Sequence, residues 1–182
     1  MRVDVVYESM FGNTREIAEA IVDGLGPTVE ARVVGVAAAV ADATLVDACD
    51  LLVVGGPTQA WSMSRPRTRS GAADYTRQPG SALHLEPGAD SGPGVREWIA
   101  GLGLVSGRAA AFDTRVHVPA VLTGRASKSI GRALERHGFR LVVPPASFFV
   151  HAKDGLLPGE AERARAFGAR LVAAVVADGA RT

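Results

Sequence analysis

Short apolar runs alternate with segments of helical periodicity along this chain. Four apolar runs have the length of a strand, at residues 3–7, 29–34, 51–54 and 109–112. Between and after them, apolar side chains recur every three to four residues, as on one face of a helix, around residues 17–25, 95–102, 130–134 and 164–175. The run 51–54 is apolar throughout, which is typical of a strand inside a parallel sheet covered on both faces.

Glycine and proline set the expected ends of these elements. Gly26-Pro27 ends the first helix, and Gly138 suits the left-handed stop of a later one. Residues 139–143 and 147–150 are interpreted as one strand interrupted at Pro144-Pro145, which places it at an edge or a bend. The alanine-rich stretch 37–49 is ambiguous, and we expect a short helix around Leu45.

Strands that alternate with helices predict an α/β fold with a parallel sheet and right-handed crossovers. The 182 residues fit a single domain, 1–182. Ligands of such folds bind outside the carboxyl ends of the strands. The loops at residues 8–14, 57–64 and 113–124 are therefore the candidate binding loops.

Residues 57–93 interrupt the rhythm of the chain, with several Pro, Gly, Ser and Arg residues and no sustained period. The stretch is longer than a routine connection, and we expect residues 64–93 to form a mobile insertion or a lid. It contains Arg65, Arg67, Arg69 and Arg77 against one acid, Asp74. Two interpretations stay open: a solvated loop, or a lid that binds a pyridine-nucleotide phosphate or an acidic partner.

Composition narrows the function classes. The net charge is +1, and the arginines lack interleaved aromatic residues, so we expect no nucleic-acid partner. One cysteine, Cys49, excludes an internal disulfide and favours a reducing, cytoplasmic setting. No apolar run reaches the roughly 20 residues of a membrane span, and the start of the chain does not resemble a secretory signal. The four histidines show no metal-ligand spacing, and the P-loop and G-x-S-x-G motifs are absent.

The loop after the first strand carries the clearest chemistry. Ser9 and Thr14 offer hydroxyls, Asn13 offers an amide, and Gly12 allows a tight turn. The first amides of the following helix point into this loop, and the helix dipole adds partial positive charge, so the loop suits a phosphate dianion. The alternative is an ordinary helix cap at Asn13 or Thr14.

Three stretches resemble flavodoxins. Ser9-Met10-Phe11-Gly12-Asn13-Thr14 is similar to their S/T-x-x-G-N-T loop for the phosphate of flavin mononucleotide (FMN), and residues 55–61, Gly-Gly-Pro-Thr-Gln-Ala-Trp, are similar to their second flavin loop. Residues 138–171 resemble their last strand and helix. The resemblance implies a flavodoxin-like, doubly wound, five-stranded parallel sheet in the order 2-1-3-4-5, with helices on both faces.

The resemblance also implies a set of FMN-binding residues. The phosphate loop would comprise Ser9, Met10, Phe11, Gly12, Asn13 and Thr14. One side of the ring would be lined by Pro57, Thr58, Gln59, Ala60 and Trp61, with Trp61 as stacking partner; the alternative is a tryptophan that packs in the core or against the insertion. The pyrimidine edge would face Asp113, Thr114 and Arg115, unless these form a solvated turn.

The chain departs from the flavodoxin pattern in three ways. It is near neutral rather than acidic, and no glycine occurs between Pro57 and Gly71. The loop after the fourth strand lacks the tyrosine that covers the second ring face, for which the nearest candidates are Phe112 and His117.

The leading hypothesis is an FMN-binding electron-transfer protein in which no side chain acts as a catalyst and a redox protein or NAD(P)H is the partner. An NAD(P)H-dependent FMN quinone reductase is a second hypothesis. A flavin-free regulatory or interaction domain of the same fold is a third.

Overall fold

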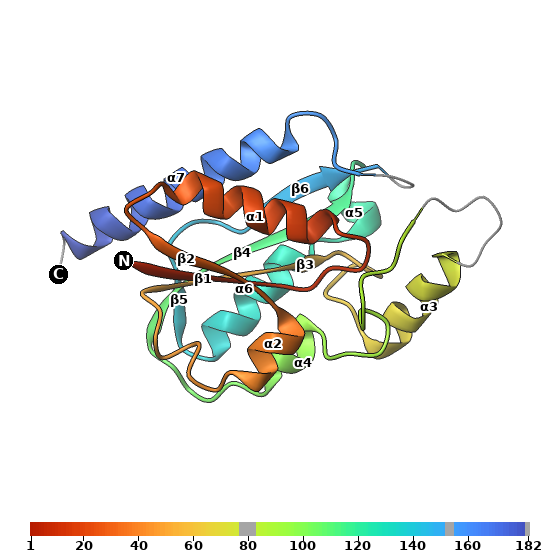
Figure 1. Ribbon diagram of the computed structural model, residues 1–182, viewed down its shortest axis with the longest axis horizontal. Helices are drawn as coiled ribbons and strands as arrows, with labels where there is room; N and C mark the ends of the chain where they lie inside the picture. Colours follow the sequence, from red (N-terminus) through yellow and green to blue (C-terminus); the bar gives the residue numbers. More distant parts are fainter. Residues whose placement is uncertain (77–82, 152–154, 181–182) are drawn as a thin grey trace.

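The computed structural model describes residues 1–76, 83–151 and 155–180, and its strands form one parallel sheet (Figure 1). The sheet has the order β2-β1-β3-β4-β5, and β6 pairs with β4 beyond the end of β5. The strands are β1 (Arg2–Tyr7), β2 (Glu30–Gly35), β3 (Leu51–Pro57), β4 (Gly107–Val116), β5 (Phe139–Leu141) and β6 (Ala146–Val150). The predicted α/β class and the order 2-1-3-4-5 are confirmed.

Helices cover both faces of the sheet (Figure 1). One face packs against α1 (Asn13–Leu25) and α7 (Glu160–Gly179), the other against α2 (Val36–Ala41), α4 (Val95–Ala100) and α6 (Ala126–Arg136). Because β3 is buried on both sides, its residues Leu51 and Val53 join the first core, and Leu52 and Val54 join the second. This explains the unbroken apolar run that the sequence shows there.

Two further helices lie near the carboxyl ends of the strands: α3 (Pro66–Thr76) and α5 (Ala120–Thr123) (Figure 1). The insertion, in which the sequence shows no sustained period, thus contains the helix α3, which the sequence did not predict. Pro66 occupies the first helical position, where its missing N–H costs nothing. Part of the expected lid, residues 77–82, lies outside the described residues.

The expected helix around Leu45 is displaced toward the amino terminus, because α2 ends at Ala41. The Asp42 carboxylate accepts hydrogen bonds from the backbone N–H of Thr44, at 3.1 Å, and from its hydroxyl, at 2.8 Å. Such a local bond competes with the helix and favours a turn. Leu45 still reaches the core, where it is fully buried.

The last strand is interrupted as predicted at Pro144-Pro145, which separates β5 from β6. The outer edge of β6 is closed by α7 and the segment before it. The N–H of Phe149 donates to the Glu160 carboxylate at 2.9 Å, and its C=O accepts from the N–H of Leu157 at 3.0 Å. These bonds satisfy groups that an open edge strand would leave free to pair with another chain.

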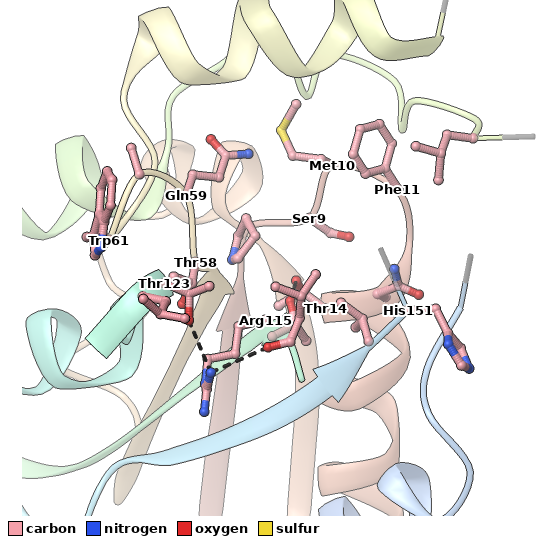
Figure 2. Close-up of a pocket in the computed structure, with 18 residues that line it drawn as sticks. Ser9, Met10, Phe11, Thr14, Thr58, Gln59, Trp61, Arg115, Thr123 and His151 are labelled. Atoms are coloured by element: carbon pink, nitrogen blue, oxygen red, sulfur yellow. Dashed lines mark hydrogen bonds between the residues drawn. The ribbon is translucent and has the colours of Figure 1, made fainter. Parts of the chain in front are cut away.

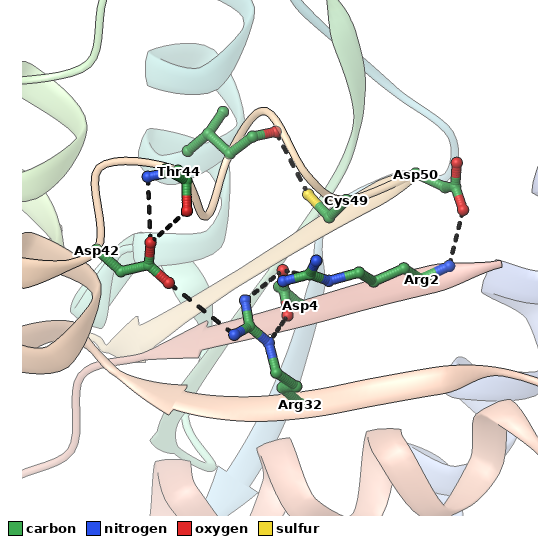
Figure 3. A network of polar contacts seen from close by, with 8 residues as sticks. Arg2, Asp4, Arg32, Asp42, Thr44, Cys49 and Asp50 are labelled. Carbon is green, nitrogen blue, oxygen red and sulfur yellow. Dashed lines mark hydrogen bonds and ion pairs between the residues drawn. The ribbon is translucent and has the colours of Figure 1, made fainter.

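A polar network lies where β1 and β2 run alongside each other (Figure 3). Asp4 on the inner strand β1 is fully buried, and its carboxylate accepts two hydrogen bonds from the Arg32 guanidinium, at 2.6 and 3.0 Å. Arg2 lies 3.7 Å from the same carboxylate, and its backbone N–H donates to Asp50. A charge on an inner strand is thus paired rather than left isolated in the core.

Candidate functional site

A cavity of about 410 Å³ opens at the carboxyl ends of β1, β3 and β4 (Figure 2). This volume falls within the range of small-molecule sites. All of the sequence-predicted binding residues line it except Gly12 and Asp113; those that do are Ser9, Met10, Phe11, Asn13, Thr14, Pro57, Thr58, Gln59, Ala60, Trp61, Thr114 and Arg115. The three loops are therefore brought together, as the rule for carboxyl ends of parallel strands requires.

The first turn of α1 faces this cavity without a side-chain cap. Gly12 precedes the helix with φ of 90°, in the left-handed region that glycine adopts without penalty. Its N–H donates to the Ser9 hydroxyl at 3.0 Å, which tightens the loop. Gly12 has no side chain to cap α1, and no side chain of the described residues accepts a hydrogen bond from the N–H groups of residues 13–15, so these amides stay available to an anion. The alternative of a plain cap at Asn13 or Thr14 is not what the structure shows.

At the start of the neighbouring helix α6, in contrast, side chains accept hydrogen bonds from the first backbone N–H groups. The N–H of Ala126 donates to the Thr58 hydroxyl at 2.9 Å, and that of Ser127 donates to the Asp113 carboxylate at 2.7 Å. Asp113 is fully buried, and it lies outside the cavity lining. The predicted residues Thr58 and Asp113 thus satisfy the start of α6, whereas the start of α1 is left open.

The hydroxyls of Thr14 and Thr114 hydrogen-bond to each other at 2.8 Å across a sequence separation of 100 residues. Both residues are buried and line the cavity. The contact links the phosphate-loop helix to the end of β4. It fixes the distance between two of the predicted binding loops.

The second loop is a tight hairpin turn. Gln59 and Ser62 exchange backbone hydrogen bonds of 2.9 and 3.0 Å, and the central residues Ala60 and Trp61 have φ of 44° and 68°. Positive φ at both central positions is the signature of a type I′ turn, which normally uses Asn or Gly. Two side-chain-bearing residues here occupy a conformation that costs of order 1–3 kcal/mol each.

This turn presents Trp61 to solvent at the cavity rim. The Trp61 side chain is 65% exposed, so the alternative of a core tryptophan is wrong. Figure 2 shows Trp61 on the hairpin turn, and Met10 and Phe11 on the first loop, at different sides of the cavity. A planar apolar ligand can therefore meet aromatic side chains from two loops.

Arg115 is the one charged side chain from β4 in the cavity lining, and it is held in place by α5 and the preceding loop. It donates to the Val118 carbonyl at 2.6 Å and, as Figure 2 shows, to the Thr123 hydroxyl at 3.2 Å. Its Nε is buried and has no hydrogen-bond partner among the described residues. The N–H at Nε can therefore donate a hydrogen bond to an acceptor atom of a bound ligand.

Sequence reasoning missed six lining residues: Leu83, Val116, Leu122, Thr123, Val150 and His151. Val150 and His151 end the last strand, so the rule for carboxyl ends would have found them. Leu122 and Thr123 lie in the loop 113–124, but no motif marked them. Leu83 reaches the cavity from the insertion, which no local pattern indicates.

The two aromatic candidates for the second ring face lie elsewhere. Phe112 is fully buried and packs edge-on against Phe148 at 6.2 Å between ring centroids. His117 packs on Phe149 at 4.5 Å. Neither lines the cavity, whose ring-bearing residues among those described, apart from Pro57, are Phe11, Trp61 and His151.

The insertion is anchored to the base of the first loop by buried charges. Arg69 on α3 is buried; it donates to the Ser64 hydroxyl and pairs with Glu97, both at 3.0 Å. Glu8 is buried beside them and accepts the N–H of Val95 at 2.9 Å. Arg69 therefore holds α3 in place, and the idea that it offers its charge to a ligand is wrong.

The described residues contain no cluster of three metal-ligating side chains and no helix long and apolar enough to span a membrane.

No family model matches this sequence, and no curated protein matches it. Solved structures do match. A flavodoxin from the domain Archaea aligns with a TM-score of 0.62 and 18% identity over 97% of this chain and 99% of its own. Oxidised flavodoxin 1 from Bacillus cereus aligns with a TM-score of 0.61 and 17% identity, covering 97% of each chain. A WrbA-like flavodoxin from Agrobacterium tumefaciens gives 0.57 and 18%, over 96% of this chain and 97% of its own.

The chain therefore has the flavodoxin-like fold over nearly its full length, as its sequence motifs indicated.

Proposed function

We propose that this protein binds FMN in the cavity at the head of α1 and transfers electrons through it. The phosphate lies against the first turn of α1, held by the loop from Ser9 to Thr14. The ring lies over the hairpin turn, with Trp61 against one face, and its pyrimidine edge is directed to the end of β4 at Thr114 and Arg115.

The observation that carries this proposal is the contrast between two helix starts at one edge of the sheet. The first amides of α6 are occupied by Thr58 and Asp113, whereas α1 has no side-chain cap and opens into the cavity. Amides at a helix start that no side chain satisfies suit an anion. Apolar and aromatic residues next to them suit a flat ring on the same ligand.

Bound FMN supplies the redox chemistry, and the chain supplies binding, orientation and the electrostatic surroundings. The unpaired Nε of Arg115 offers a donor to an acceptor atom at the ring edge. Its positive charge favours added negative charge on the ring, so Arg115 is the residue that would raise the reduction potential. None of the described side chains has to act as an acid or a base.

Exposed apolar side chains next to the cavity support a protein partner for electron transfer. Trp61, Val118, Val121 and Leu122 are all exposed, and two of them, Trp61 and Leu122, also line the cavity. A single exposed apolar residue is ordinary, but a group beside a ligand site suits a contact surface. A neutral chain that docks through apolar contact does not need the acidic surface of other flavodoxins.

Titration of FMN with the purified protein, followed by flavin fluorescence, tests the proposal. We expect quenching with a dissociation constant in the micromolar range or below. No binding at tens of micromolar FMN would instead support the flavin-free interaction domain. Steady oxidation of NAD(P)H by the FMN-loaded protein with a quinone would make it a reductase rather than a carrier.

A further inference from the structure

A second cavity, of about 590 Å³, lies at the sheet edge where β5 gives way to β6. The break at Pro144-Pro145 opens it, since the chain leaves the sheet there and exposes a recess lined by β4, the residue before α6, the segment 143–149 and α7. Four arginines line it: Arg115, Arg125, Arg163 and Arg170. We call this cavity the arginine pocket.

Two of these arginines are fixed by neutral acceptors. Arg125 donates to the Ser147 hydroxyl and the Pro145 carbonyl, both at 3.1 Å. Arg115 donates to the Val118 carbonyl and the Thr123 hydroxyl. These bonds order the side chains without neutralising their charge. The remaining N–H groups of both guanidinium groups make no hydrogen bond to the described residues.

The other two arginines come from α7. Arg163 pairs with the buried carboxylate of Glu160 at 2.6 Å, and it is the only one of the four with an ion pair to a described residue. The Arg170 guanidinium lies over the Phe167 ring, 5.4 Å from its centroid. One acid is therefore paired with one of four arginines, and three positive charges of the pocket have no acidic partner among the described residues.

Uncompensated guanidinium groups that converge on a recess repel one another and attract an anion. The planar guanidinium group of arginine can donate two parallel hydrogen bonds to the oxygens of phosphate. The side chains of Arg115 and Arg125 are already ordered by their bonds to neutral groups, so a ligand would lose less entropy in ordering them. We propose that the arginine pocket binds the phosphoryl group of a small molecule, separately from the FMN phosphate at α1. Arg115 lines both cavities, so the two ligands would lie next to each other.

Calorimetric titration of inorganic pyrophosphate into the full chain at low salt tests this site, with or without FMN. We expect saturable binding that Arg125→Gln and Arg170→Gln each weaken about tenfold, the value of one charge-assisted hydrogen bond. Arg170 makes no hydrogen bond to a described residue and only one ring contact, with Phe167, so thermal unfolding of its variant is measured beside binding to separate the two effects. Arg165→Gln is the matched control, because it removes the same charge from α7 outside the pocket.

Three outcomes would overturn the proposal: no pyrophosphate binding, equal weakening by the control variant, or competition between pyrophosphate and FMN, which would place the anion at α1. ADP, NADH and NADPH titrations separate the sources of the phosphoryl group. Tighter binding of a nucleotide than of pyrophosphate supports a nucleotide ligand, and equal or weaker binding supports a free phosphoryl anion. Because the readout needs no flavin, failure here leaves the proposed FMN function untouched.

Discussion

At the scale of single residues, the hairpin turn holds two residues in a backbone conformation that their residue types disfavour. Ala60 and Trp61 hold positive φ values that β-carbon-bearing residues disfavour, and Trp61 gains little burial in return. Such strain persists where the surrounding structure imposes it and is frequent at ligand sites. The Trp61 side chain is therefore best explained by what it contacts when a ligand is bound.

Substitution of Trp61 by glycine separates stability from binding. Glycine adopts positive φ freely, so we expect the free energy of unfolding to stay within about 1 kcal/mol of wild type or to rise. FMN affinity should fall about tenfold as the stacking face is lost. Trp98→Ala is the contrasting variant: Trp98 is buried, and its loss should cost about 3–5 kcal/mol. Urea denaturation and FMN titration measure both effects, and a large loss of stability in the glycine variant would contradict the account.

Cys49 should be an unreactive thiol. Burial, followed by the negative charge of Asp4, raises the pKa of Cys49 to about 11. At pH 8 only about one thiol in a thousand is then ionised, and the thiolate is the reactive form. Labelling with a thiol reagent at pH 8 should be far slower in the folded protein than in urea, and it should speed up as the pH rises toward 11. Equal rates in the folded and unfolded protein would disprove this.

At the scale of elements, α1 and α7 pack closely through glycines. A β-carbon on Gly168 would lie 2.2 Å from the Ile21 carbonyl oxygen, and one on Gly24 would lie 2.0 Å from the Arg165 carbonyl oxygen. Neither atom can move without shifting a helix. The two helices therefore approach as closely as their backbones allow.

Gly168→Ala should destabilise the protein although alanine is the better helix former. We expect a loss of about 1–3 kcal/mol or more from overpacking, against a gain of about 1 kcal/mol in helix propensity. Gly71→Ala in α3 is the control, because a β-carbon there meets nothing within 4 Å. It should be neutral or stabilising. Thermal unfolding of both variants reports the difference, and similar shifts in Tm for the two would contradict the close packing.

The end of α7 is tied to the sheet by Asp178, which pairs with Arg108 at 2.8 Å and also with Arg140. Hydrogen bonds from Arg108 and Arg140 lower the pKa of Asp178 below 3.8. A lowered pKa in the folded state stabilises the protein above the unfolded value, and this contribution is lost as the pH falls through the folded one. Asp178→Asn should therefore be less stable than wild type at pH 7, and the gap should narrow as the pH falls below 3.8 toward the lowered pKa of Asp178. A gap that stays constant across this range would rule out the ion pairs as its cause.

Sequence reasoning succeeded for elements whose packing follows from their own periodicity. The run Leu51 to Val54 fixed β3 at the centre of the sheet, and the prolines at 144 and 145 located the break in the last strand. It failed for α2, where the side chain of Asp42 ends the helix early. It also failed for α3, which is anchored by Arg69 through Ser64 and Glu97, and no local pattern reveals that distant partner.

The candidate site likewise has parts that the local sequence predicts and parts that depend on contacts between distant residues. The sequence marks the loop from Ser9 to Thr14 because helix starts that bind phosphate need particular residues in order, and the structure places that loop at the cavity. The burial of Asp113 under α6 and the strained turn at Trp61 depend on contacts between elements. Likewise, only the fold brings Arg115, Arg125 and Arg170 to one cavity, since their positions in the sequence form no motif.

At the scale of the whole molecule, open polar groups and several exposed apolar side chains meet at one edge of the sheet. The uncapped start of α1, the cavity and the apolar rim around Trp61 all lie at the carboxyl ends of the strands. The opposite edge is closed by ion pairs such as those of Asp178 and Asp4. The cavity therefore opens on this face, where the FMN proposed above would place its phosphate at the start of α1 and its ring beside Trp61.

The measurement that tests this most directly is a comparison of FMN with riboflavin, which lacks the phosphate, by fluorescence titration of the same protein. If the start of α1 holds the phosphate, FMN should bind at least about a hundredfold more tightly, a difference of about 2.7 kcal/mol. Valine at position 12 would strain the loop, because φ is 90° there, although its β-carbon would meet no other atom within 4 Å. Gly12→Val should therefore remove most of the difference in affinity between FMN and riboflavin. Equal affinities for FMN and riboflavin, or no binding of either, would contradict a phosphate site at α1.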